Sequence, residues 1–203
     1  MTITKEKAQD IWSPHHDRII RVIESAWAEY IALKQCRLEN GFAPLLYSRT
    51  KSNDIFDAIA RYAFEEFGSD EKFMLRTEAQ TFKIFHSNCC IRFKKSGTNL
   101  LGNNIPTQAA MAFAEADGQL PNMPPNTAKL EIVWVANDIF TELESIHILA
   151  RDGDTLLWEY PIDRADDKEI VINIPTSPTD PDDDFDGLIK PKRDSELDKK
   201  DRA

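Results

Sequence analysis

Basic residues gather in one stretch of this acidic chain, and their spacing indicates a contact with an anion. Residues 76–108 hold five Lys or Arg residues and one acid, although the whole chain of 203 residues has a net charge of −10. Positive charge concentrated against the overall balance is typical of a surface that binds an anionic group. The predicted contact set has four cations and four polar residues, expected on one exposed patch: Lys83, Arg92, Lys94, Lys95, Asn103, Asn104, Thr107 and Gln108.

The polar members of this set follow two glycines, Gly97 and Gly102, and precede a short helix expected near 107–116. Glycine lets the backbone approach a ligand closely, and the free N–H groups at the start of a helix attract anions. A phosphate or a carboxylate is therefore the predicted ligand, with ordinary turn and capping chemistry as the alternative. The segment is not a P-loop, because no Lys followed by Ser or Thr comes after the second glycine.

Two helices are expected to precede these residues. The first is predicted to begin at Ser13-Pro14, a hydroxyl cap followed by proline, and to end near Asn40-Gly41, which is a stop signal. The second is predicted to run from Asn53 to Gly68. Both have apolar residues at helical spacing, so their apolar faces are expected to form the core.

Beyond Gly68 the apolar residues alternate, which predicts strands. A two-residue turn at Ser87-Asn88 would pair Ile84 with Ile91 and place the apolar side chains on one face. The other face would then place Lys83 opposite Arg92. Like charges in such a pair destabilise a sheet, so the two side chains either hold an anion or diverge into water.

Four further strands are predicted, at 129–137, 144–151, 155–162 and 169–174. A three-residue turn with a glycine bulge is expected between the second and third of them. This turn sets Ile146 against Tyr160, Ile148 against Trp158 and Ala150 against Leu156, with His147 beside Glu159 on the outer face.

The predicted fold class is α+β, with two N-terminal helices, a β-hairpin, a short helix and an antiparallel meander. Residues 1–174 are expected to form one domain, with a helical part at 1–68 and a sheet part at 73–174. Residues 175–203 are rich in Asp, Pro and Lys. Such a segment buries too little apolar surface to offset its ordering entropy, so a disordered acidic tail is predicted.

Several classes of site are disfavoured. The order of elements is similar to that of PD-(D/E)xK nucleases, but Arg92 stands where a metal-binding carboxylate is needed. A degenerate nuclease-like scaffold that keeps nucleic-acid contacts stays open. Cys89 and Cys90 with His86 lack the further ligands that zinc requires. No catalytic residue, metal or cofactor is predicted.

Composition sets the compartment that we expect. Apolar residues make up 41% of the chain, which is enough for a core, but no apolar run has the ~18–20 residues of a membrane span. The polar start lacks the apolar segment of a secretory signal, and three cysteines without framework spacing fit reduced thiols. A cytoplasmic protein without a membrane partner is predicted.

Several of these segments resemble a family of small uncharacterised bacterial proteins without a settled activity. The resemblance spans roughly residues 49–162 and departs from the family at Asn122, where glycine is expected. It is carried by Arg92-Phe93-Lys94-Lys95, residues 101–108, residues 120–124, Ala150-Arg151-Asp152 and residues 157–161. It implies an operon shared with helix-turn-helix regulators and ImmA/IrrE-type proteins, as in toxin–antitoxin or phage-defence modules.

Three functions stay open at this point. The favoured one is a non-enzymatic accessory or regulatory component of such a module, which binds a co-encoded regulator or toxin protein. The second is a nucleic-acid-binding protein, against which the net charge of −10 argues, because phosphate contacts dominate that affinity. The third is a toxin enzyme with an unrecognised active site.

Overall fold

The computed structural model describes residues 2–78, 81–102, 108–115, 118 and 123–163 of the chain. The chain divides into two units, Met1–Lys168 and Glu169–Ala203. The second unit lies entirely outside the described residues, and so do the predicted strand at 169–174 and the predicted tail at 175–203.

A six-stranded mixed sheet forms the centre of the first unit, with strands in the order β1-β2-β3-β4-β5-β6. Neighbouring strands are antiparallel except β3 and β4, which are parallel. A parallel pair requires a crossover connection, and this one contains α4 (Gln108–Ala114). The α+β class is thus confirmed. The strands are β1 Met74–Glu78, β2 Thr81–His86, β3 Cys89–Ser96, β4 Ala128–Ala136, β5 Leu143–Asp152 and β6 Thr155–Pro161.

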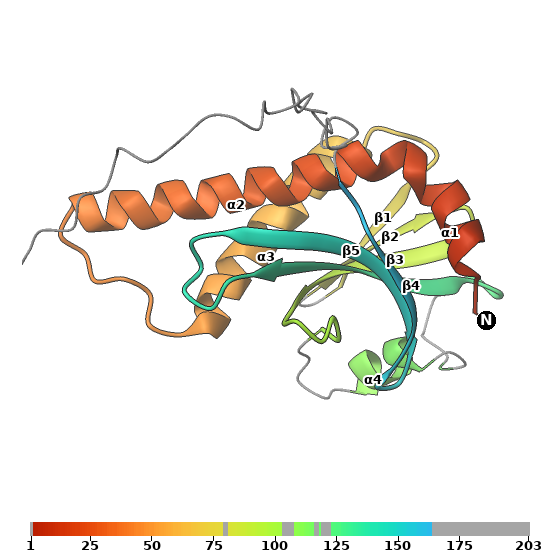
Figure 1. Ribbon diagram of the computed structural model, residues 1–203. Helices are drawn as coiled ribbons and strands as arrows, with labels where there is room; N and C mark the ends of the chain where they lie inside the picture. Colours follow the sequence, from red (N-terminus) through yellow and green to blue (C-terminus); the bar gives the residue numbers. More distant parts are fainter. Residues whose placement is uncertain (1, 79–80, 103–107, 116–117, 119–122, 164–203) are drawn as a thin grey trace, which may run out of the picture. The chain divides into compact units, whose positions relative to one another are not determined.

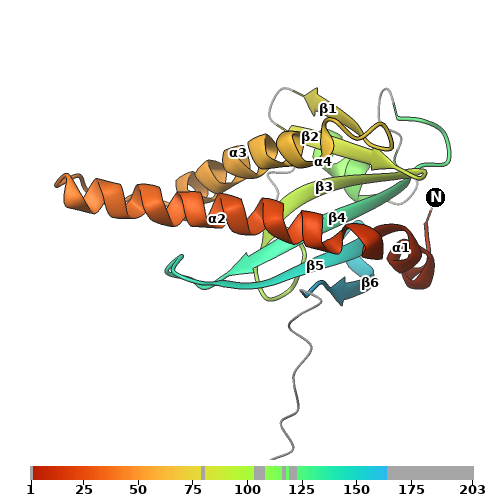
Figure 2. The ribbon, with the colours of Figure 1, turned by 90° about the horizontal axis from the view of Figure 1, so that it is seen from above.

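Two long helices, α2 (His16–Glu39) and α3 (Ser48–Phe67), cover one face of the sheet. Figure 2 shows both helices lying across the strands. We call this side the helix face; α4 lies on the opposite side, the outer face (Figure 1). The main core fills the helix face and includes the fully buried Ile91, Phe93 and Ile132, whereas Phe85, Cys90 and Phe113 form a smaller cluster on the outer face.

The predicted helix starts were wrong. A helix that was not predicted, α1 (Lys5–Trp12), comes first, and Thr4 caps it by accepting a hydrogen bond from the Lys7 N–H at 3.4 Å. Ser13–His15 then form a short 3-10 turn, so the Ser-Pro pair begins a connection between two helices. Helix α3 begins at Ser48, before the predicted Asn53.

The β2–β3 hairpin has the predicted register, with Ile84 paired to Ile91 and His86 to Cys89. Ser87 and Asn88 both have positive φ, 46° and 60°, as a two-residue turn of this hand requires. Strand β1 was not predicted; it adds to the free edge of β2.

The predicted register of β5 with β6 was wrong by two residues. Ile148 pairs with Tyr160, and Ala150 pairs with Trp158. The turn has two residues between the paired Asp152 and Thr155, and the register shifts between Ala150 and Arg151. This bulge restores the alternation that a two-residue turn alone would have reversed, so the apolar side chains keep their predicted face.

A substitution at Gly153 tests the backbone geometry of the β5–β6 turn. Its φ is +57°, and a Cβ added there would meet nothing within 4 Å, so Gly153→Ala has a backbone cost only. We expect it to lower the free energy of unfolding by about 1 kcal/mol in urea denaturation. Gly97→Ala is the control, because Gly97 lacks a positive φ and its Cβ would make only an ordinary contact, 3.9 Å from Asn99 Oδ1. Equal losses of stability in the two variants would contradict the turn geometry.

Candidate functional site

The predicted cations do not share one exposed patch. Because side chains alternate along a strand, β3 places Arg92 and Lys94 on the outer face and Lys95 on the helix face. Lys83, on β2, joins the outer face but is only 6% exposed, and its Nζ lies 2.5 Å from Glu78 Oε1. Arg92 is also 6% exposed. The expectation that Lys83 and Arg92 face solvent was therefore wrong.

Arg92 and Arg151 converge on one buried carboxylate. Glu131, which is 1% exposed, lies beside Arg92 in the parallel β3–β4 pair. Its Oε1 accepts hydrogen bonds from Arg92 Nε at 2.9 Å, from Arg92 Nη2 at 2.5 Å and from Arg151 Nη2 at 3.2 Å. The side chain of Arg151 is only 7% exposed. We call Arg92, Lys94, Glu131 and Arg151 the Glu131 cluster.

Lys94 is the half-buried member of this cluster. Burial, followed by repulsion from Arg92, lowers the pKa of its amine from 10.5 to about 8; Glu131 opposes the shift, and Arg151 adds to it. Within the described part of the chain, the Lys94 amine makes no hydrogen bond or ion pair.

Two parts of the described chain lie against the cluster: Gly102, which precedes α4, and α4 itself. A Cβ on Gly102 would lie 3.0 Å from Lys94 Cβ, so the close approach of this loop requires glycine. The guanidinium of Arg92 lies over the Phe113 ring of α4, 4.0 Å from its centroid. Lys129 fixes the end of α4 by donating to three backbone carbonyls, those of Ala112, Glu115 and Gly118.

The charges of the cluster leave an excess of two positive charges when Lys94 is protonated, because three cations surround one carboxylate. Such an arrangement attracts anions. Asn103, Asn104 and Thr107 lie outside the described residues, and Gln108 is the exposed first residue of α4. Sequence reasoning missed Glu131 and Arg151 as members, because only the pairing of distant strands brings them to Arg92.

Lys95 belongs to a second cationic region, at the end of the molecule where α2 and α3 are joined. Its Nζ lies 4.9 Å from the centroid of Phe140, and Lys51 approaches the same ring at 5.3 Å. Lys34 Nζ lies 3.5 Å from the Phe140 carbonyl oxygen. These contacts place the β4–β5 turn against both helices.

A cavity of about 50 Å³ opens beside this turn. Large apolar side chains on the joining segment and the adjacent helix ends are 50–82% exposed, and we call these five residues the α2–α3 tip: Leu33, Leu38, Phe42, Leu46 and Tyr47. The cavity is lined by apolar residues and by four charged ones, Lys34, Arg37, Lys51 and Asp54.

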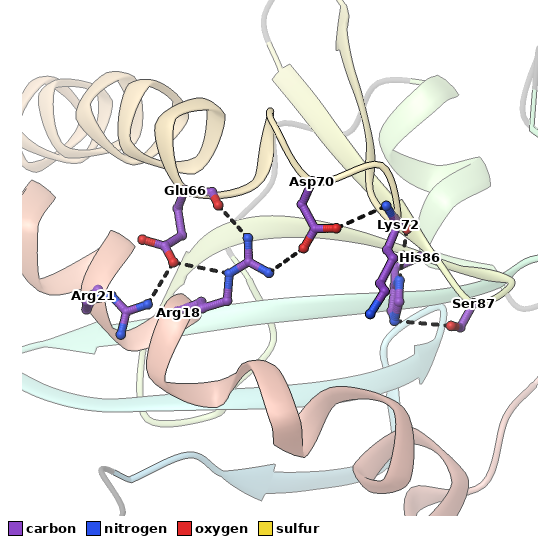
Figure 3. Close-up of polar contacts among 7 residues, drawn as sticks. All are labelled: Arg18, Arg21, Glu66, Asp70, Lys72, His86 and Ser87. Atoms are coloured by element: carbon purple, nitrogen blue, oxygen red, sulfur yellow. Dashed lines mark hydrogen bonds and ion pairs between the residues drawn. The ribbon is translucent and has the colours of Figure 1, made fainter.

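A cluster of charged and polar side chains between α2 and the α3–β1 connection already has internal partners (Figure 3). Arg18 Nε lies 3.1 Å from Glu66 Oε1, and Arg18 Nη1 lies 2.9 Å from Asp70 Oδ2. His86 Nδ1 lies 3.0 Å from the Lys72 carbonyl oxygen. Burial, then the nearby His86, lowers the pKa of His15. We read this cluster as structural, since it ties α2 to the α3–β1 connection.

One further hydrogen-bonded series lies on the outer face. His147 Nδ1 lies 2.8 Å from Glu159 Oε2, and His147 Nε2 lies 3.0 Å from Ser145 Oγ. The predicted pairing of His147 with Glu159 was wrong in register, since His147 pairs with Pro161 and Glu159 with Leu149, but the two side chains still meet on the predicted face. The order serine, histidine, carboxylate is that of a nucleophile, a base and the group that orients the base.

Three comparisons with known proteins found no match, whether to protein-family models, to curated proteins or to solved structures. Among the residues that the structure describes, no group of three or more His, Cys, Asp or Glu could hold a metal ion. No helix in the described ranges has the length and apolar character needed to span a membrane.

Lys94 gives the site a pH dependence. Because its folded-state pKa of about 8 lies below the ordinary 10.5, the charged amine costs free energy below pH 8, and this cost is relieved between pH 8 and 10.5. We expect Lys94→Met to raise the free energy of unfolding at pH 7 by on the order of 1–3 kcal/mol. Urea denaturation at pH 7 and 9.5 should show the gap between wild type and variant narrowing as pH rises; a constant gap would contradict the shift.

Proposed function

We propose that this chain is a non-catalytic accessory or regulatory component of a bacterial toxin–antitoxin or phage-defence module and acts by binding a co-encoded protein. The observation that carries the binding proposal is the α2–α3 tip, where Leu46 and Tyr47 are 82% and 73% exposed. Large apolar side chains that gather on the surface of a folded domain often mark an interaction site. Its burial in a complex supplies a driving force of roughly 25 cal/mol per Å².

The charges around the tip define the partner. Lys34, Arg37 and Lys51 line the adjoining cavity together with one acid, Asp54, so its wall has an excess of two positive charges. Lys95 adds a further cation at the Phe140 ring. The segment that fits is acidic and carries apolar anchor residues, because it pairs these cations while filling the apolar floor.

The assignment to a defence or toxin–antitoxin module is supported by the resemblance across residues 49–162. Protein binding is favoured over nucleic-acid binding for a physical reason. Lys83 and Arg92 are each 6% exposed, so two of the four predicted cations lie too deep to contact the phosphates of a long polymer.

The tip is tested with the purified products of the neighbouring open reading frames. We expect Leu33→Asp combined with Leu46→Asp to weaken binding of the co-encoded partner at least about 10-fold in calorimetry, since two charges would enter an apolar contact. Met111→Asp is the matched control, because Met111 on α4 is 52% exposed and Leu33 is 50% exposed. Unchanged affinity in the double variant, or an equal loss in the control, would contradict the assignment.

A second candidate, an enzyme, is favoured by the Ser145–His147–Glu159 series alone. A fluorophosphonate probe separates the two functions, because an activated serine forms an Oγ–P bond with it and releases fluoride. Under the binding proposal, we expect wild type and Ser145→Ala to be labelled equally weakly. If the probe labels the wild type and does not label Ser145→Ala, the chain is an enzyme.

A further inference from the structure

We propose that the Glu131 cluster binds the phosphoryl group of a small ligand on the outer face of the sheet. This site is separate from the α2–α3 tip, and the inference does not rest on the protein-binding function. Three observations support it: the balance of charge, the unpartnered donors and the burial of the guanidinium groups.

The balance of charge leaves the cluster incompletely neutralised. The side chains of Arg92 and Arg151 are each 7% exposed, and both donate to the same carboxylate oxygen, Glu131 Oε1. One carboxylate offsets one of three cations. Buried charge without a counter-charge costs several kcal/mol per ion, so the site is stabilised by a bound anion. A phosphoryl dianion carries the two negative charges that are missing.

The cluster also has donors left to make contacts. Among the described residues, Arg151 Nε is buried without a hydrogen-bond partner, and so is Ser96 Oγ, which is two residues beyond Lys94 on the same strand face. The acceptor Glu131 Oε2 is also buried and unpartnered there. The Lys94 amine makes no hydrogen bond or ion pair with the described residues. An amine, a guanidinium N–H and a hydroxyl are the donor types that phosphoryl oxygens accept.

The burial of the guanidinium groups limits the size of the ligand. The side chains of Arg92 and Arg151 are each 7% exposed, and Gly102 and Phe113 lie against the cluster. Lys94 is half-buried. A compact anionic group can enter beside its amine, whereas the surface of a folded protein or of a duplex is too broad to reach the guanidinium groups.

The pKa of Lys94 adds a signature that a surface lysine would not give. An anion beside the amine favours its charged form, so binding takes up a proton when the amine is partly neutral. With a free pKa of about 8, the affinity for a dianion that does not titrate should fall roughly 10- to 30-fold between pH 7 and 9.5.

The experiment is calorimetry and thermal unfolding of the full chain at constant ionic strength. The probes are sulfate, inorganic phosphate, adenosine monophosphate and adenosine, with chloride as the reference. We expect saturable binding of sulfate and phosphate by the wild type, with a rise in melting temperature that chloride does not give. Lys94→Met should lose at least about 10-fold in affinity, and Lys94→Arg should bind at pH 7 and lose the pH dependence.

Lys95→Met is the matched control, because Lys95 is the next residue but lies on the helix face; it should bind the probes as the wild type does. If adenosine monophosphate binds more tightly than phosphate and adenosine does not bind, the ligand is a phosphorylated nucleoside. If adenosine monophosphate and phosphate bind with equal affinity, the ligand is a free oxyanion. The proposal would be overturned if sulfate and chloride changed the melting temperature equally. It would also be overturned if Lys94→Met and Lys95→Met lost the same affinity for the probes. Binding of the co-encoded partner is measured separately, so the two proposals fail independently.

Discussion

The carboxylate of Glu131 is the interaction on which the outer face of this protein depends. One buried oxygen receives hydrogen bonds from Arg92 on β3 and from Arg151 on β5, so it links the three central strands. Removing one partner from such a buried group costs ~3–5 kcal/mol, because the remaining charge is left without its counter-ion. The same residues seat α4, since Phe113 lies over the Arg92 guanidinium. Stability of the sheet and the charge of the site thus come from the same side chains.

The sheet also separates two kinds of surface. Alternation along β3 sends Lys94 to the Glu131 cluster and Lys95 to the Phe140 ring, although the two residues are adjacent in the chain. The outer face concentrates charge in a small enclosed space. The helix face ends at the α2–α3 tip, where five large apolar side chains are 50–82% exposed, and cations line the adjoining cavity. An enclosed charged site suits a small anion, and a broad apolar surface suits a protein segment.

Local features were the ones that the sequence could predict. The β2–β3 hairpin was correct because two turn residues fix its register. The predicted pairing of His147 with Glu159 was wrong, but their side chains still meet because an even shift of register keeps side chains on the same face. The parallel pairing of β3 with β4 is set by contacts between segments far apart in the chain. Glu131 could therefore not be placed beside Arg92, and the predicted basic patch lacked the carboxylate that partly neutralises it.

The Glu131 cluster holds an excess of positive charge beside the half-buried amine of Lys94. The most direct measurement is the pKa of Lys94 by NMR of protein labelled with 13C at lysine Cε, assigned with Lys94→Arg. We expect the Lys94 amine to titrate near pH 8. A titration near the ordinary value of 10.5 would show that the amine is solvated and distant from the guanidinium groups, and the cluster would then have no excess charge for an anion to neutralise.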